Sequence, residues 1–176
     1  YIPEACEFKG RAIYTDCDMI NYRDIAELFD TDMEDKPIAA RKGNRFGGHE
    51  FCVMLFDCEK MEDYTVPVAR QRNLYSYHHR MISNFSGNDK LVKELDPRWN
   101  CLDGENYPLD EIYQLHFTKM NSQPWKPAWF AGQPEEHRRP DVKQAFYTAF
   151  EEAMEAGYDD RTLLNELQED VVNYDI

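Results

Sequence analysis

The chain has 176 residues, of which 42% are hydrophobic and 14% aromatic, and this composition excludes an intrinsically disordered or low-complexity protein. It carries 34 acidic and 20 basic residues, so its formal net charge is −14 at pH 7. A field of this sign repels phosphate backbones and anionic lipids, which argues against nucleic acid or a membrane surface as a partner. The length corresponds to little more than one domain, and we expect residues 1–176 to form a single one.

The five cysteines indicate the cellular compartment. They form no C-x-x-C pair, and an odd, scattered set is typical of reduced thiols in a cytoplasmic protein rather than of disulfides or a zinc site. No apolar run approaches the roughly 18 residues that a membrane span needs. We therefore expect a cytoplasmic protein with no integral membrane segment.

The hydrophobic pattern predicts strands alternating with helices along the first two thirds of the chain. Ile25, Leu28 and Phe29 have the i, i+3, i+4 spacing of a short amphipathic helix. The wholly apolar residues 51–56 are typical of a strand buried on both faces of a sheet. We expect strands at 12–14, 37–40, 51–56 and 112–117, a helix at 24–29, and two helices within 59–93 that are separated near residues 86–88.

The C-terminal segment, residues 140–176, is predicted to be helical. Pro140 and Asp141 are typical of a helix start, and apolar residues then recur at helical spacing until Gly157. Asp159 or Asp160 would cap a second helix. Its apolar face would comprise Leu163, Leu164, Leu167 and Val171. The whole pattern predicts an α/β fold with a mostly parallel sheet, flanking helices and a C-terminal helical pair.

A specific chemical signal lies at the end of the first predicted strand, where the sequence reads Asp16-Cys17-Asp18. Side chains two residues apart on an extended chain point the same way, so the two carboxylates share one side. At the rim of an α/β sheet, such a pair suits a hard divalent cation, Mg²⁺ or Mn²⁺, that keeps open positions for the phosphate oxygens of a nucleotide. The alternative is a surface turn that carries two solvated acids.

The residues around this signal resemble the D-x-D region of GT-A-fold glycosyltransferases, and of family 8 (the glycogenin-like and lipopolysaccharide-galactosyltransferase-like group) in particular. A strand, the two aspartates and a short helix at 24–29 follow one another as in that family. Three later segments are similar to the family's buried strand beside the acceptor site, to its recurring Trp-Asn segment, and to its motif H-x-x-G-x-x-K-P-W. These are Val53-Met54-Leu55-Phe56-Asp57, then Pro97-Arg98-Trp99-Asn100, then Leu115-His116-Phe117-Thr118 with Gln123-Pro124-Trp125. The resemblance runs in the right order over roughly residues 1–130.

The resemblance implies a set of metal ligands. Asp16 and Asp18 would bind Mn²⁺ or Mg²⁺, and His116 would be the third protein ligand. A neutral imidazole is an acceptable ligand beside two carboxylates on Mn²⁺. Taken alone, His116 could instead end a buried strand with its ring nitrogens bonded to the backbone.

The resemblance also implies how a nucleotide-sugar would bind. The Asp16-Cys17-Asp18 segment would lie against the diphosphate of a UDP-sugar. Gln123 stands where the family has its phosphate-binding lysine, so either Lys119 or Lys126 would supply the positive charge.

The activity implied is that of a metal-dependent hexosyltransferase, which moves a hexose from a UDP-sugar to a carbohydrate or lipid-sugar acceptor with retention of anomeric configuration. In this fold, the units that bind the base and ribose of the donor come before the D-x-D, whereas only residues 1–11 precede the first predicted strand. We therefore expect the chain to be the C-terminal part of a longer transferase and to be inactive on sugar nucleotides by itself.

Two other functions fit parts of the sequence. The run Asp16-Cys17-Asp18-Met19-Ile20 approaches the D-x-D-x-[TV] motif of haloacid-dehalogenase-type phosphohydrolases. In such an enzyme Asp16 would be the nucleophile and Asp18 the general acid and base. The second alternative is a non-catalytic interaction domain that has kept a transferase-like fold.

Overall fold

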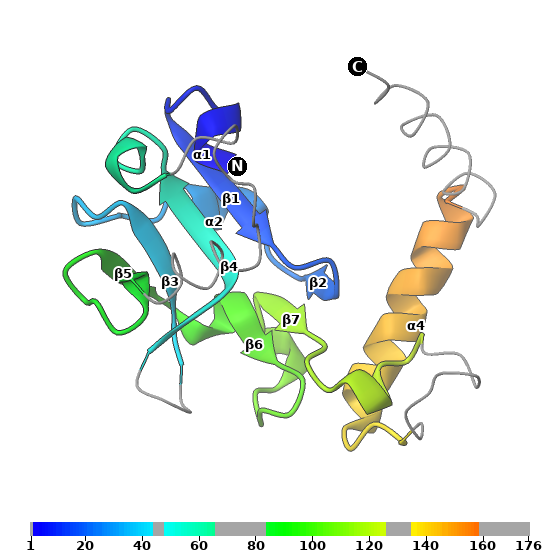
Figure 1. Cartoon of the computed structure of the whole chain (residues 1–176). Coiled ribbons are helices and arrows are strands. Elements are labelled where there is room, and N and C mark those ends of the chain that lie inside the picture. The colour runs from blue at the N-terminus through cyan, green and yellow to red at the C-terminus, as the bar shows by residue number, and fades with distance from the viewer. Residues whose placement is uncertain (1, 44–47, 66–83, 126–134, 159–176) are drawn as a thin grey trace. The chain divides into compact units, whose positions relative to one another are not determined.

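A computed structural model describes residues 2–43, 48–65, 84–125 and 135–158 (Figure 1). The chain divides into two compact units, Tyr1–Thr118 and Lys119–Ile176, which are described separately. In the described ranges, no helix has both the length and the apolar character that crossing a membrane requires.

The first unit is built on a four-stranded sheet with the strand order β1-β4-β3-β5 (Figure 1). Its strands are β1 (Arg11–Thr15), β3 (Ile38–Lys42), β4 (His49–Asp57) and β5 (Val92–Leu95). The central strand β4 is antiparallel to both β1 and β3, and β5 is parallel to β3. The strands predicted at 12–14 and 51–56 are therefore confirmed with wider bounds, and the strand predicted at 37–40 is confirmed with shifted bounds, Ile38–Lys42.

Hydrophobic side chains cover both faces of this sheet. Val53 and Leu55 of β4 belong to one buried cluster, together with Leu28 and Trp99. Phe56 belongs to the cluster on the opposite face, because side chains alternate along a strand. Burial on both faces explains why the sequence of β4 is apolar without alternation.

A second, three-stranded sheet has the order β2-β7-β6 and comprises β2 (Met19–Asn21), β6 (Cys101–Leu102) and β7 (Gln114–His116). β2 is antiparallel to β7, and β6 is parallel to it. A 3-10 helix, Pro97–Asn100, connects β5 of the first sheet to β6 of the second. The pairing of β2 with β7 brings the Asp16–Asp18 segment close to His116, because β2 directly follows that segment and β7 ends at His116.

Two predictions from the sequence are wrong in detail. Among the residues that the structure describes, three of the five strand pairings are antiparallel, so the sheets are mixed and not mostly parallel. The second of the two helices expected within 59–93 is replaced at its end by the strand β5 (Val92–Leu95). That strand has too few residues for a period of two or of 3.6 to be recognised. Most of the first expected helix lies outside the described residues.

The short helix α2 (Ile25–Phe29) confirms the helix predicted at 24–29. Of its apolar residues only Leu28 is fully buried, whereas Ile25 and Phe29 remain 38% and 41% exposed. A helix of five residues cannot be stable by propensity alone, and Asp24 stabilises its first turn by accepting a hydrogen bond of 2.9 Å from the Ala26 N–H.

We predict that Asp24→Ala lowers the free energy of unfolding by about 1 kcal/mol, the usual contribution of an N-cap side chain. Chemical denaturation measures this change. Asp30→Ala is the matched control, because Asp30 is an exposed acid at the C-cap of the same helix and its charge is not favoured there. An equal loss in both variants would contradict the capping role of Asp24.

In the second unit, the helix α4 (Pro140–Glu155) confirms the first helix of the predicted C-terminal pair. Pro140 occupies the first turn, where its missing N–H costs nothing. Gly157 has φ of 92°, and the Tyr158 N–H donates to the Ala153 carbonyl at 3.0 Å. These are the features of a Schellman motif, which ends the helix at the predicted glycine. The second helix expected after Asp159 or Asp160 lies outside the described residues.

Candidate functional site

The two aspartates of the D-x-D segment lie where the chain passes from the first sheet to the second. Asp16 directly follows β1, and its N–H donates to the Cys52 carbonyl on β4 at 2.9 Å. Asp18 directly precedes β2, and its carbonyl accepts from the Phe117 N–H at 3.0 Å. Each aspartate is therefore fixed by the backbone of a neighbouring strand.

His116 brings the two carboxylates together. It ends β7 and pairs with Met19 of β2, the residue that follows Asp18 in the chain. Its Nε2 atom is 3.3 Å from Asp18 Oδ1 and 3.8 Å from Asp16 Oδ2. The imidazole is only 6% exposed, whereas the side chains of Asp16 and Asp18 are 32% and 24% exposed. A buried imidazole thus faces two carboxylates that are partly open to solvent.

Asn100 fixes the orientation of the His116 ring from behind. Asn100 is completely buried, and its Oδ1 atom lies 2.9 Å from His116 Nδ1. An amide oxygen can only accept, so Nδ1 carries the proton and the lone pair of the neutral ring is on Nε2. That lone pair is directed toward the side of the ring where the carboxylates lie. A second hydrogen bond of this kind is the usual way in which a protein orients a metal-binding histidine.

The donor set fits a divalent cation. Without a cation or a proton between them, a nitrogen lone pair and two carboxylate oxygens repel one another. Ligands at right angles on an ion with bonds of about 2.1 Å lie about 3 Å apart, close to the separation of His116 and Asp18. Oxygen atoms with one imidazole suit Mn²⁺ or Mg²⁺.

Tyr14 and Cys52 complete the surroundings of Asp16. The Tyr14 hydroxyl donates to Asp16 Oδ1 at 2.7 Å, and this hydrogen bond, with burial, raises the pKa of Tyr14 to about 12. Burial also raises the pKa of the Cys52 thiol to about 12, and the negative charge of Asp16 acts in the same direction. Asp16, Cys52 and His116 each offer one possible ligand atom, and these three atoms lie within 4.8 Å of one another.

A buried ion pair lies next to His116 on the other side of Asn100. The Arg41 side chain is 3% exposed; its Nη1 atom donates to the Asn100 carbonyl at 2.5 Å and to Glu105 Oε2 at 2.8 Å. A further hydrogen bond joins Arg41 Nη2 to Glu105 Oε1, and Arg41 Nε lies 3.6 Å from Glu50 Oε2. Burial opposes the charged form of Glu105, but the hydrogen bonds from Arg41 and from the Leu102 N–H, together with the positive charge of Arg41, outweigh it and lower the pKa of Glu105.

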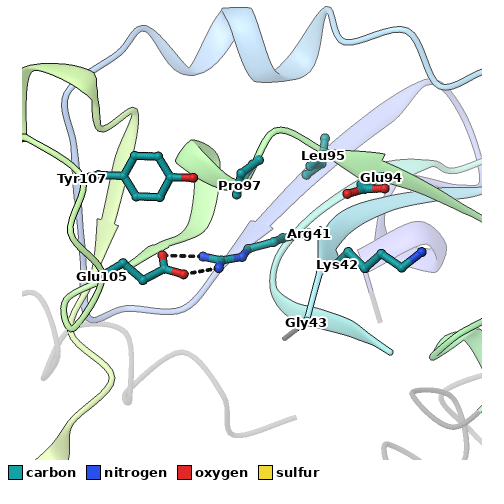
Figure 2. Close-up of a pocket in the computed structure, with 8 residues that line it drawn as sticks. All are labelled: Arg41, Lys42, Gly43, Glu94, Leu95, Pro97, Glu105 and Tyr107. Atoms are coloured by element: carbon teal, nitrogen blue, oxygen red, sulfur yellow. Dashed lines mark hydrogen bonds and ion pairs between the residues drawn. The ribbon is translucent and has the colours of Figure 1, made fainter. Parts of the chain in front are cut away.

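The same ion pair forms one wall of a pocket of about 380 Å³ (Figure 2). Figure 2 shows the Arg41 guanidinium bonded to Glu105, with Tyr107 beside them. The remaining lining residues are Lys42, Gly43, Glu94, Leu95 and Pro97. Charged groups of both signs and one phenol ring make the pocket suitable for a ligand with many hydroxyl groups.

The other residues predicted for the nucleotide are placed as follows. Cys17 is exposed between the two aspartates. Lys119 belongs to the second unit and is paired with Glu135 of that unit. Lys126 lies outside the described residues.

Sequence reasoning missed four members of this region. Cys52 lies opposite Asp16 because Thr15 pairs with Val53 in the β1–β4 ladder, and only the strand register could have revealed this. Asn100 stands in the Trp-Asn segment that the sequence singled out, but nothing in the sequence gave it a role. The contact of Arg41 with Glu105 spans 64 positions, and no local pattern indicates it.

We predict that Asn100→Ala lowers the affinity for Mn²⁺ about 10- to 100-fold, the usual effect of removing the group that orients a histidine ligand. Titration calorimetry measures the affinity, and circular dichroism checks that the variant is folded. Asn106→Ala is the control, because Asn106 is exposed. A folded Asn100→Ala variant with the affinity of the original chain would contradict the role of Asn100.

Comparison with known proteins identifies the class of fold. No protein-family model matches the sequence, and no curated protein matches it. Among solved structures, the chain resembles glycosyltransferases, and its mixed α/β architecture is the GT-A-like fold expected from the sequence.

One of these is the glycosyltransferase GlyE of Streptococcus pneumoniae TIGR4, with a TM-score of 0.57 and 18% identity over 98% of this chain and 46% of GlyE. The apo form of GlyE gives a TM-score of 0.56 with 19% identity, over 94% of this chain and 44% of GlyE. The bifunctional glycosyltransferase WbbM in its apo form gives 0.50 with 13% identity, over 70% of this chain and 31% of WbbM. The chain therefore spans less than half the length of these proteins.

Proposed function

We propose that the chain belongs to a metal-dependent glycosyltransferase that moves a hexose from a UDP-sugar to a carbohydrate or glycolipid acceptor, with retention of anomeric configuration. The observation that carries this proposal is the convergence of Asp16 and Asp18 on His116, whose Nε2 atom lies 3.3 Å from Asp18 Oδ1 and 3.8 Å from Asp16 Oδ2. The glycosyltransferase-like fold supports it.

Each residue has a distinct task in this proposal. Asp16, Asp18 and His116 hold Mn²⁺ or Mg²⁺, and a bound cation would neutralise the charge that develops on the departing diphosphate. Asn100 keeps the lone pair of His116 directed at the site.

The pocket beside Arg41 is where we place the acceptor. Arg41 and Glu105 hold each other rigidly, so the pocket presents fixed polar groups that need little reordering when a ligand binds. Tyr107 offers an aromatic face, which suits the C–H face of a sugar ring. The Arg41–Asn100–His116 connection keeps this pocket next to the metal ligands.

Titration calorimetry with Mn²⁺ and UDP tests the proposal. We expect Mn²⁺ to bind to the chain and UDP to bind in its presence more tightly than in its absence. Asp18→Ala should abolish both signals. Absence of Mn²⁺ binding, or a UDP signal that does not depend on Mn²⁺, would contradict the proposal.

The two alternative functions predict different results in simple assays. A haloacid-dehalogenase-type phosphohydrolase, with Asp16 as nucleophile, would turn over p-nitrophenyl phosphate with Mg²⁺, whereas a transferase should not. A non-catalytic domain would bind neither Mn²⁺ nor UDP. The glycosyltransferase-like fold and the convergence of His116 on both aspartates favour the transferase.

A further inference from the structure

Cys52 adds a sulfur atom to the two candidate metal ligands Asp16 and His116. The carboxylate oxygen, the thiol sulfur and the imidazole nitrogen lie within 4.8 Å of one another. The backbone fixes the position of Cys52, because its carbonyl accepts a hydrogen bond of 2.9 Å from the Asp16 N–H. Residues opposite each other on neighbouring antiparallel strands direct their side chains to the same face, so the sulfur and the Asp16 carboxylate share one side of the sheet.

The chemistry of these three atoms differs from that of the oxygen-rich set. Thiolate and imidazole donors select soft or borderline ions such as Zn²⁺ and Cd²⁺, whereas carboxylates suit Mg²⁺ and Mn²⁺. Donors of a tetrahedral zinc ion, with bonds of about 2.3 Å to sulfur and about 2.0 Å to nitrogen, lie roughly 3.5 Å apart. Closing the observed cluster onto one ion therefore needs shifts of at most about 1 Å.

We propose that Asp16, Cys52 and His116 bind a soft divalent ion, Zn²⁺ or Cd²⁺, in competition with the hard ion that Asp16, Asp18 and His116 bind. This inference rests on the metal site of the proposed function and adds Cys52 as an alternative ligand to it. Both sets use the same carboxylate and the same imidazole, so one ion excludes the other. A soft ion is consequently an inhibitor of the Mn²⁺-dependent activity.

Binding of the soft ion replaces the S–H bond of Cys52 by a sulfur–metal bond, and the thiol proton passes to solvent. A hard ion does not need this exchange, because Asp18 supplies an oxygen in place of the sulfur. The thiol is therefore expected to matter for Cd²⁺ and to be nearly irrelevant for Mn²⁺.

Titration of the full chain with Cd²⁺ tests the proposal, because cadmium–thiolate bonds absorb in the ultraviolet. We expect Cys52→Ser to remove this absorption at one equivalent of Cd²⁺ and to lower the Cd²⁺ affinity at least about tenfold, while the Mn²⁺ affinity changes less than about twofold. Cys6→Ser is the matched control, because Cys6 is a half-buried free thiol like Cys52 but lies outside the proposed site. Cys6→Ser should behave like the original chain.

Two further measurements make the result decisive. In electron paramagnetic resonance, Cd²⁺ should release bound Mn²⁺ from the original chain, and cadmium NMR should report sulfur ligation without any substitution. If Mn²⁺ binds but the Cd²⁺ signal is unchanged in Cys52→Ser, or Cd²⁺ does not release Mn²⁺, the role of Cys52 is overturned and the proposed function stands. If neither ion binds, both are overturned.

Discussion

Replacing His116 by alanine should lower the affinity of the chain for Mn²⁺ by at least about 100-fold. Even loss of a group that only orients a ligand costs 10- to 100-fold, and loss of the ligand itself should cost no less. The imidazole nitrogen is the atom that both Asp16 and Asp18 face. Without it, two carboxylates remain that repel each other and can hold the ion from one side only. Titration calorimetry or electron paramagnetic resonance of Mn²⁺ measures the loss.

Asp18→Asn is the companion variant, because it keeps the shape of the side chain and removes only the charge. It should lose affinity to a similar extent. Asp110→Asn is the matched control, since Asp110 is an exposed acid of the 3-10 helix Leu109–Glu111, and it should bind Mn²⁺ as the original chain does. Equal effects of Asp18→Asn and Asp110→Asn would show that Mn²⁺ is attracted only by the net negative charge.

Replacing Arg41 by methionine should lower the free energy of unfolding by about 3–5 kcal/mol, the range for breaking a buried ion pair by removal of one partner. The Arg41 side chain is 3% exposed, and its loss removes the hydrogen bonds and the positive charge that Arg41 gives to the partly buried Glu105 and Glu50. The double variant Arg41→Met with Glu105→Gln should be less destabilised than the single variant, because it removes the Glu105 charge together with that of Arg41. Chemical denaturation measures all of these changes.

Lys9→Met is the control for this series, because Lys9 and Glu7 form an ion pair whose side chains are 74% and 77% exposed. Such a pair contributes little, and the variant should unfold like the original chain. If Arg41→Met costs no more than Lys9→Met, the buried ion pair does not stabilise the fold.

The stabilisation by Glu105 should also depend on pH. Its pKa is lowered in the folded state from an ordinary value of 4.5, so its contribution is present above that pH and is lost as the pH falls through the folded-state pKa. Glu50 affects the stability in the opposite direction. Burial raises its pKa, so its charged form destabilises the fold, and this destabilisation disappears when Glu50 is protonated at low pH. The difference in unfolding free energy between the original chain and Glu105→Gln should therefore shrink below about pH 4.5. A difference that stays constant down to pH 3 would contradict this assignment.

Strands and helices with a clear hydrophobic pattern could be predicted from the sequence, and the direction of the strands could not. Residues 51–56 are apolar because both faces of β4 are buried, and this is a local property of the sequence. Whether β4 runs parallel or antiparallel to β1 depends on the connections between them. The usual inference from alternating strands and helices therefore predicted a mostly parallel sheet, whereas most of the described strand pairings are antiparallel. β5, with four residues, was missed because it is too short to show a period.

The candidate site could be predicted only as far as its residues resemble a known motif. Asp16, Asp18 and His116 were singled out in that way, and the structure places them side by side. Asn100 and Cys52 reach the same place through the pairing of strands that are distant in the sequence. Arg41 and Glu105 are ordinary charged residues in the sequence, and only their burial distinguishes them.

The register between β1 and β4 limits where the protein can tolerate insertions and deletions. Asp16 and Cys52 are opposite each other only because of the register in which Thr15 meets Val53. One residue added within β1 would turn the carboxylate to the other face of the sheet, even if the sheet still formed. One residue added beside the exposed Asn106, in the loop that leads from Glu105 to β7, would change no strand pairing. The protein can therefore vary in length in that loop and keep its metal ligands in place, whereas it cannot do so in the strand that leads to Asp16.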